Sequence, residues 1–240
     1  MKTLNVEGYD GYDDGSYFIG EGLPLYTRYL KKYAGVDPNT GESLWYRNVK
    51  DDDGNITGQE TTSTYANGDY YLGGDPIPDL YGGFGLTFDW KGFDFSVNFS
   101  YQLGGLAYDS GYAALMASPT SSSTGTNLHV DIYKSWSAEN PDSNIPRFQY
   151  NDLYSTGSSD RFLTDASYLN VENINLGYTF PSKWTNKIGI ASCRLYAACE
   201  NVGYISARKG FDPRYSFTGA TNYSTYLPIR TISGGITLKF

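Results

Sequence analysis

The sequence predicts an all-β fold, an antiparallel transmembrane β-barrel of which this chain supplies part of the wall. Three observations lead to that prediction. Apolar and polar residues alternate through 84–103 and 229–240, which is the period of a strand with one apolar face. The connections between the expected strands alternate between short and long, as they do in outer-membrane barrels. Aromatic residues gather at both ends of the expected strands, like the two aromatic girdles of such a barrel.

Composition agrees with a β-rich protein and excludes some classes of partner. The chain has 240 residues, 17% aromatic residues and a net charge of −8. Aromatic residues favour strands, and an acidic chain without a basic stripe cannot neutralise phosphates, so nucleic acid is not an expected partner. The mean hydropathy is −0.45, which a barrel accommodates because its strands are only half apolar.

Cysteine and histidine usage gives no indication of a metal or cofactor site. Cys193 and Cys199 fall in one expected strand, about 20 Å apart at roughly 3.3 Å per residue, so a disulfide is not expected. His129 is the single histidine, and metal-ligand spacing is absent. Met1 does not open a signal peptide, because Glu7 follows without an apolar core region. We therefore expect either a protein that is not exported or a chain that belongs to a longer one.

Two strands are expected in the first third of the chain, at 23–33 and 42–48. The alternation in both is imperfect, and the turn-forming residues of 34–41 separate them. A polar loop follows at 51–58. This loop departs from a calcium-binding loop because its glycine, Gly54, is in the fourth position rather than the sixth.

A hairpin is the clearest element, with strands at 83–90 and 93–103. A two-residue turn at Lys91-Gly92 pairs position 90 with 93, 88 with 95, 86 with 97 and 84 with 99, and every pair is apolar. A strand as long as 93–103 spans about 36 Å, and a tilt of about 45° projects it to roughly 25 Å. That projection equals the height of the lipid-facing band of an outer-membrane barrel.

The next expected strand, 168–180, changes its apolar phase partway along. Leu169 and Val171 share one phase, whereas Ile174 and Leu176 share the other. A switch of this kind indicates a β-bulge, in which one extra residue turns the following side chains to the other face.

The remaining connections complete the alternation of loop lengths. A long polar loop at 104–167, with one or two helical turns near 128–136, precedes this strand, and a short link with Trp184 follows it. A strand at 192–204, a loop at 205–228 and a last strand at 229–240 end the sequence. If the last strand descends to the periplasm, the short links lie on the periplasmic side and the long loops outside the cell.

Several segments together resemble the C-terminal part of SusC/RagA-type TonB-linked, or TonB-dependent, outer-membrane transporters. Their order is that of the family, and they cover most of the chain. Ala197 and Cys199 depart from the family, which has large apolar residues there. The segments are A-G-V-D-P-N-T-G at 34–41, G-D-P-I-P-D-L-Y-G-G-F at 74–84, S-D-R-F-L-T-D-A-S-Y-L-N-V-E-N-I-N-L-G-Y-T-F-P at 159–181, E-N-V at 200–202, G-F-D-P-R at 210–214 and L-P-I-R-T at 227–231.

The resemblance implies a barrel of about 22 strands in the outer membrane of a Gram-negative bacterium. It also implies a plug domain, a SusD-like surface lipoprotein lid, energy from a TonB complex, and import of glycans or peptides. Residues 1–240 contain about seven expected strands, too few to close such a barrel. We therefore expect a C-terminal fragment of one barrel domain from which the plug domain is absent.

Candidate binding residues lie in the long loop and on the polar side of one strand. Tyr108, Tyr133 and Trp136 are expected to stack on sugar faces, or instead to pack the loop against itself or the lid. Arg194 and Glu200 are expected to face the lumen, where they either contact substrate or only hydrate the wall. The last strand resembles an outer-membrane assembly signal, carried by Ile236, Leu238 and Phe240.

An enzyme is not expected. His129 has Asp131 close by, but the sequence offers no serine elbow of the G-x-S-x-G kind. The alternative to the importer is a soluble, secreted β-sandwich that binds glycans through its tyrosine-rich loops.

Overall fold

The computed structural model describes residues 11–120, 125–152, 154, 157–215, 218–219 and 226–240. The chain divides into two compact units. We call Pro78–Gly104, Ala166–Arg214 and Ser224–Phe240 the sheet unit, and Met1–Ile77, Gly105–Asp165 and Tyr215–Tyr223 the loop unit. The fold is predominantly β, with antiparallel pairing between all its named strands, as the sequence predicts. No helix in the described ranges is long and apolar enough to cross a membrane.

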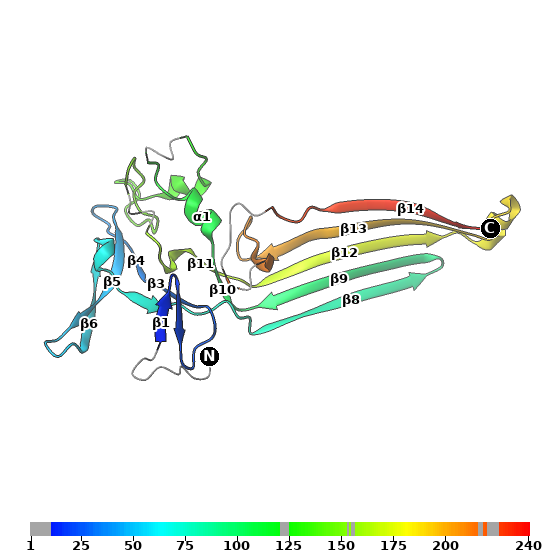
Figure 1. Ribbon diagram of the computed structural model, residues 1–240. Helices are drawn as coiled ribbons and strands as arrows, with labels where there is room; N and C mark the ends of the chain where they lie inside the picture. The colour runs from blue at the N-terminus through cyan, green and yellow to red at the C-terminus, as the bar shows by residue number, and fades with distance from the viewer. Residues whose placement is uncertain (1–10, 121–124, 153, 155–156, 216–217, 220–225) are drawn as a thin grey trace. The chain divides into compact units, whose positions relative to one another are not determined.

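The sheet unit contains one five-stranded sheet in the order β14-β13-β12-β9-β8 (Figure 1). Residues of alternating polarity give this sheet two different faces. The apolar face includes the row Leu86, Val97, Ile174, Cys199 and Ile232, and the polar face includes the row Thr87, Ser96, Asn175, Ala198 and Ser233. The strands are β8 (Leu80–Trp90), β9 (Phe93–Leu103), β12 (Tyr168–Thr179), β13 (Ser192–Ser206) and β14 (Thr231–Lys239).

The hairpin of β8 and β9 has the register that the sequence predicts. Trp90 lies opposite Phe93 and Phe84 opposite Phe99, and the rings of Phe84 and Phe99 stack with centroids 4.8 Å apart. Lys91 and Gly92 both have positive φ, 48° and 92°, as a two-residue hairpin turn requires. The strand β8 begins at Leu80, three residues before the expected start, since glycines at 82 and 83 hide the alternation there.

The bulge expected in β12 is present. Val171 pairs with Phe99 and Asn173 pairs with Asn98, so Glu172 is an extra residue relative to β9. The register between β12 and β13 shifts at the same place. The bulge keeps Ile174 and Leu176 on the apolar face in spite of the phase switch in the sequence.

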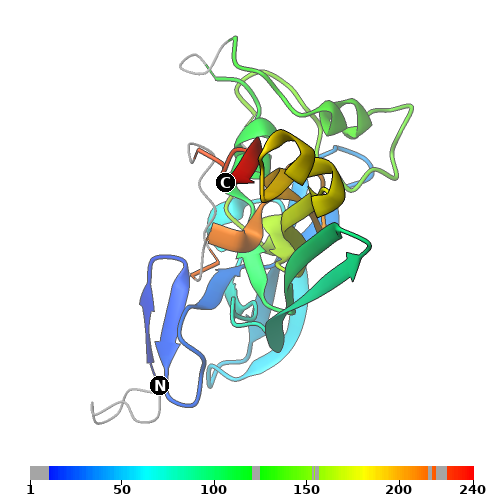
Figure 2. The ribbon, with the colours of Figure 1, turned by 90° about the vertical axis from the view of Figure 1, so that its right-hand side faces the viewer.

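A short helical link joins β12 to β13, formed by α2 (Ser182–Thr185) and η4 (Asn186–Ile188). Gly189 follows with φ of 75°, the left-handed conformation that commonly ends a helix. The amide of Ala191 donates to the carbonyl of Lys239 over 2.8 Å. This link and the end of β14 therefore lie at the same end of the sheet (Figures 1 and 2).

The loop unit contains three smaller sheets, in the orders β1-β2-β3-β7, β4-β5-β6 and β10-β11. Its helical turns are η1 (Tyr65–Asn67), α1 (Ser110–Leu115), η2 (Val130–Lys134) and η3 (Asp160–Phe162), and η5 (Pro213–Tyr215) lies at the boundary of the two units. Its strands are β1 (Gly11–Asp14), β2 (Tyr17–Gly20), β3 (Thr27–Lys31), β4 (Tyr33–Val36), β5 (Ser43–Lys50), β6 (Ile56–Thr62), β7 (Tyr70–Leu72), β10 (Leu106–Tyr108) and β11 (Leu163–Asp165).

The prediction of a single strand at 23–33 is wrong. The segment instead contains a turn, with Tyr26 at φ of 65°, and then β3, which ends before Lys32. After Lys32 the chain enters a different sheet as β4. The strand expected at 42–48 is β5, which pairs with β4 and β6 in the loop unit. The five later strands of the seven expected are those of the five-stranded sheet.

The core of the loop unit includes a buried tryptophan and a buried lysine. Trp45 is buried and meets Tyr65 edge to face, with centroids 5.1 Å apart. The Lys31 ammonium donates to the carbonyls of Tyr65 and Gly68 over 2.6 and 2.8 Å. Burial lowers the pKa of Lys31, and these carbonyls compensate part of the lost hydration.

Candidate functional site

The polar face of the five-stranded sheet carries a ladder of amide and hydroxyl side chains. The Asn98 amide donates to Asn173 over 3.0 Å, and the Asn175 amide donates to Ser96 over 3.2 Å. Further along β12, the Asn170 amide donates to Ser100 over 3.3 Å. These side chains meet because residues paired across antiparallel strands point to the same face. The result is a continuous wall of hydrogen-bonding groups.

An ion pair continues this polar wall across three strands. Arg194 of β13 donates to Asp94 of β9 through Nε, over 3.0 Å, and Nη2, over 2.5 Å. The intervening strand β12 has Gly177 at this point, and a Cβ there would lie 2.4 Å from both Arg194 Nη2 and Asp94 Oδ1. The lack of a side chain at Gly177 is therefore what lets the two charged groups meet. The Arg194 guanidinium also lies 5.4 Å from the ring centre of Tyr196.

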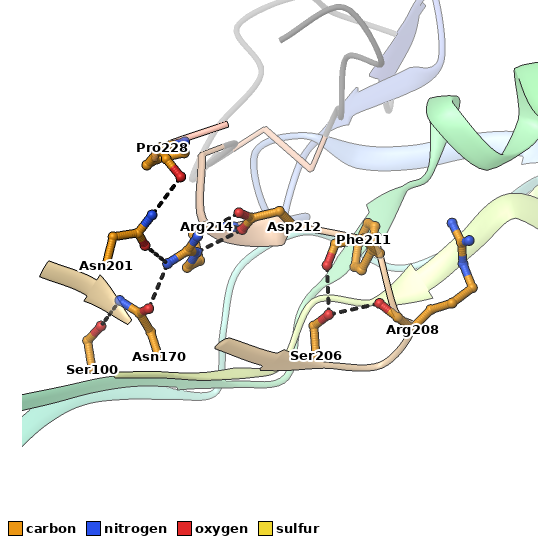
Figure 3. A network of polar contacts seen from close by, with 9 residues as sticks. All are labelled: Ser100, Asn170, Asn201, Ser206, Arg208, Phe211, Asp212, Arg214 and Pro228. Atoms are coloured by element: carbon orange, nitrogen blue, oxygen red, sulfur yellow. Dashed lines mark hydrogen bonds and ion pairs between the residues drawn. The ribbon is translucent and has the colours of Figure 1, made fainter. Parts of the chain in front are cut away.

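A second, more buried ion pair lies at the other end of the sheet (Figure 3). Arg214 donates to both carboxylate oxygens of Asp212 over 2.7 and 2.8 Å, and the two side chains are only 7% and 2% exposed. The same guanidinium donates to Asn170 over 2.6 Å and to Asn201 over 3.2 Å. It also lies 4.3 Å from the ring centre of Tyr204. Arg214 thus joins the segment after β13 to side chains of β12 and β13.

Asn201 connects this network to the start of the last strand. Its backbone has φ of 49°, a left-handed conformation that asparagine tolerates better than most residues. Its side-chain amide donates to the carbonyl of Pro228 over 2.6 Å (Figure 3). The Ser206 hydroxyl donates to the carbonyls of Phe211 and Arg208 over 2.6 and 3.1 Å. The described residues that follow β13 and those that precede β14 are therefore both hydrogen-bonded to β13.

In the loop unit the structure brings together two of the three expected aromatic binding residues. Tyr133 and Trp136 line one groove of about 710 Å³. Tyr108 packs elsewhere, 6.0 Å from Phe162 in an edge-to-face arrangement and 6.0 Å from the Arg28 guanidinium. Burial raises the pKa of Tyr108. Tyr108 is therefore not among the residues that line this groove.

The other expected site residues lie on opposite faces of the five-stranded sheet. Arg194 and Glu200 are both on the polar face of β13, where Glu200 is opposite Asn173 and Thr231. Ile236, Leu238 and Phe240 alternate along the last strand, and they are 64%, 43% and 90% exposed.

The arrangement offers hydrogen bonds and charge, and no metal-binding cluster occurs in the described ranges. There, no group of three or more His, Cys, Asp or Glu side chains lies close enough to hold an ion. Cys193 and Cys199 are free thiols, as their spacing predicts. They lie opposite Leu238 and Ile232 on the apolar face.

Two parts of the site are not evident from the sequence. The partner of Arg194 depends on the registers of β9, β12 and β13 together, which the sequence does not specify across the long loop at 104–167. The network of Arg214 involves Asn170 and Asn201, which are 44 and 13 residues away from it in sequence. A usable signal was the polarity of Asn170 and Ser100, which mark the polar face at that end.

The relatives of this chain that sequence comparison finds are TonB-dependent receptors. No family model matches the chain. It is 28% identical to the TonB-dependent receptor P3 of Formosa agariphila over 177 residues, 70% of this chain and 17% of the receptor. It is 26% identical to the TonB-dependent receptor SusC of Bacteroides thetaiotaomicron over 242 residues, 96% of this chain and 22% of the receptor.

Solved structures agree with these relatives. The RagAB peptide transporter matches with a TM-score of 0.74 and 25% identity, over 98% of this chain and 25% of that chain. The RagAB peptide importer in its closed-closed state matches with a TM-score of 0.75 and 25% identity, over 97% of this chain and 25% of that chain. This chain thus spans a quarter or less of the length of these relatives. The sequence, the fold and the two faces of the sheet together relate this chain to the SusC/RagA-type TonB-dependent receptors.

Proposed function

We propose that this chain is part of a TonB-dependent outer-membrane importer of glycans or other large nutrients. In this proposal the five-stranded sheet is part of the barrel wall, and the loop unit belongs to the extracellular loops. The main support is the contrast between the two faces of the sheet. Leu86, Phe88 and Ile232 are 62%, 58% and 77% exposed on the apolar face, whereas hydrogen-bonded Asn, Ser, Asp and Arg side chains occupy the other. Lipid outside and an aqueous lumen inside match this contrast.

The soluble β-sandwich is less well supported. In a sandwich, the apolar side chains of one sheet are buried against a second sheet about 10 Å away. Here the apolar side chains of β8 and β14 are largely exposed. An exposed apolar face of this extent requires a covering partner or a membrane.

The two edge strands of the sheet support a barrel wall that is extended by further strands. The strands β8 and β14 are the two outer strands of the sheet, and an unpaired edge of this length favours pairing with other strands. Since the chain spans only 25% of the RagAB chain that it resembles, we propose that both edges pair with strands of a longer protein that also carries a plug. A SusD-like lipoprotein lid, a TonB complex and outer-membrane lipid are the proposed partners of that protein.

The full-length protein that contains this chain tests the proposal. We expect it to fractionate with the outer membrane, and its deletion to abolish uptake of at least one fluorescent oligosaccharide or peptide. Uptake should also cease when the TonB complex is inactivated. Recovery of the protein in soluble form from the periplasm or the medium would favour the β-sandwich instead.

A further inference from the structure

The apolar face of the five-stranded sheet has a hollow of about 560 Å³, which we call the Gly234 hollow. Its floor consists of small residues, because Ala197 of β13 lies opposite Gly234 of β14. A Cβ at Gly234 would come no closer than 3.4 Å to another atom, the carbonyl oxygen of Tyr196. Larger side chains of the same face surround this floor: Phe93, Leu176, Tyr178, Leu195 and Ile236.

The side chains around the hollow are exposed. Phe93 is 45% exposed, Leu195 is 48% exposed and Ile236 is 64% exposed. In the proposed importer this face contacts lipid, so the occupant that reaches the hollow is an acyl chain. Elsewhere on this face the paired positions carry larger side chains, such as Ile174 and Ile232. The hollow is therefore a place where a chain can lie deeper than on the rest of the face.

The helical link between β12 and β13 combines exposed apolar and exposed basic side chains. Trp184 is 56% exposed and Ile188 is 72% exposed, and Lys183 and Lys187 are exposed beside them. Both pairs have the four-residue spacing of neighbours on a helical surface. Tryptophan and isoleucine beside lysines are typical of a segment that lies in the membrane interface, with its lysines at the level of the lipid head groups.

This end of the sheet unit is basic although the chain as a whole is acidic. Residues 176–193 contain no Asp or Glu, whereas the chain has a net charge of −8. Lys91 adds a third lysine from the hairpin turn at the same end (Figure 1). Neither it nor the two lysines of the link has an ion-pair partner in the described part of the chain. Asp89 and Asp94 lie on the polar face. The charge beside the apolar face is therefore complementary to an anionic head group.

The distance between the hollow and the link suits one lipid molecule. Leu195 borders the hollow and is three residues from Ser192, where β13 begins after the link. Three residues of a strand span about 10 Å. A phospholipid can therefore place its head group at the link while one of its acyl chains lies in the hollow.

We propose that the Gly234 hollow and the link together bind one anionic diacyl phospholipid of the phosphatidylglycerol class, from the leaflet that faces the periplasm. One acyl chain fills the space above Ala197 and Gly234, and Lys183 and Lys187 pair with the head group. This inference rests on the proposed outer-membrane function, in which this face contacts lipid. It concerns selectivity for one lipid, so it can fail while outer-membrane location and uptake remain as proposed.

The test uses the full-length protein in detergent, equilibrated with equal amounts of phosphatidylglycerol and phosphatidylcholine that have the same acyl chains. Native mass spectrometry counts the lipids that the protein retains, and we expect more phosphatidylglycerol. Lys183→Gln and Lys187→Gln should each lower the ratio of the two lipids about fivefold, since each lysine near the head groups attracts anionic lipid. Lys209→Gln is the matched control, because Lys209 is exposed beyond the opposite end of β13 and should leave the ratio unchanged.

A second pair of variants tests the hollow. Ala197→Leu places a larger side chain on its floor and should lower retention of both lipids several-fold without changing their ratio. Ala198→Leu adds the same side chain one residue away on the polar face and should have no effect. Thermal melting of each variant checks that the barrel remains folded.

The opposite results overturn the proposal. Equal retention of the two lipids by the wild-type protein would mean that this face has no site for an anionic lipid. A ratio that Lys183→Gln and Lys187→Gln leave unchanged would place the head group elsewhere. Equal retention by Ala197→Leu and Ala198→Leu would exclude the hollow, and a dimer without lipid that Ala197→Leu dissociates would assign the hollow to a second copy of the protein.

Discussion

Asp94 and Arg194 form an ion pair across the strand that separates them, in the space above Gly177. They are 100 residues apart in sequence, and they meet only because β9, β12 and β13 lie side by side in register. The pair joins the two strands that flank β12 and makes that part of the polar face a charged surface. If this face lines a lumen, a solute that passes there meets a compensated pair rather than a free charge.

The space above Gly177 leads to the first prediction. Gly177→Ala should displace the ion pair without breaking the fold, because the atoms nearest the added Cβ are the ends of flexible side chains. Asp94→Asn should then lower the melting temperature less in the Gly177→Ala background than in the wild-type protein, since coupled sites are not additive. Melting of the four full-length proteins in detergent measures this coupling, and additive effects would contradict it.

The control for this experiment is another glycine in the same sheet. Gly234 lies on the apolar face, where a Cβ would come no closer than 3.4 Å to another atom, Tyr196 O. Gly234→Ala and Asp94→Asn should therefore be additive.

The sheet was predictable from the sequence because its alternation is local. Trp90 and Phe93 fix the hairpin register through a two-residue turn, and the phase switch between Val171 and Ile174 locates the bulge. The loop unit was not predictable in the same way. Lys32 separates two strands of different sheets, and no local pattern marks that change because both neighbours of Lys32 continue a strand-like sequence. The pairs Asp94 with Arg194 and Asn170 with Arg214 depend on packing over long sequence separations.

The two faces of β8 provide the second prediction. Leu86→Arg places a charge on the apolar face and Thr87→Arg places the same charge on the polar face, one residue away in mid-strand. If the apolar face contacts lipid, Leu86→Arg should cost about 2–4 kcal/mol near the bilayer midplane, whereas the lumen face tolerates charge. Outer-membrane levels of the two full-length variants measure the difference. Equal levels would argue against lipid contact.

The buried pair of Asp212 and Arg214 provides the third prediction. Arg214→Leu leaves Asp212 buried without its cation, which should cost about 3–5 kcal/mol locally. The double substitution Arg214→Leu with Asp212→Leu should be milder, since no uncompensated charge remains. Limited proteolysis between Arg208 and Arg214 of the full-length protein reports the effect. If the double variant is cleaved as fast as Arg214→Leu, the unpaired Asp212 carboxylate is not the cause of the destabilisation, and the loss of the Arg214 side chain itself is.

A fourth prediction concerns alkaline pH and the turn that presents Tyr133. Burial, and then the hydrogen bond to Asp131, raise the pKa of Tyr112 to about 12. A free phenol ionises near pH 10. The stability that the protonated Tyr112 hydroxyl contributes to the folded protein is therefore complete below about pH 10 and is lost as pH rises through about 12. The difference in tyrosinate absorbance between wild type and Tyr112→Phe should therefore appear with a midpoint near 12. A midpoint near 10 would contradict both the burial of Tyr112 and its hydrogen bond to Asp131.

The last strand provides the fifth prediction, which concerns assembly. Ile236, Leu238 and Phe240 lie on one face, and Phe240 is 90% exposed, so its ring is available to an assembly factor or to the membrane interface. Phe240→Asp in the full-length protein should lower its outer-membrane level several-fold and increase its degradation in the periplasm. The matched control is Lys239→Asp, because Lys239 lies opposite Ser192 on the polar face. Immunoblots of membrane fractions compare the two variants at equal expression. Equal outer-membrane levels of the two variants would mean that the apolar side chain at position 240 has no role in assembly. A defect in Phe240→Asp alone would show that assembly requires an apolar side chain at this position, because the same acidic residue is tolerated on the polar face.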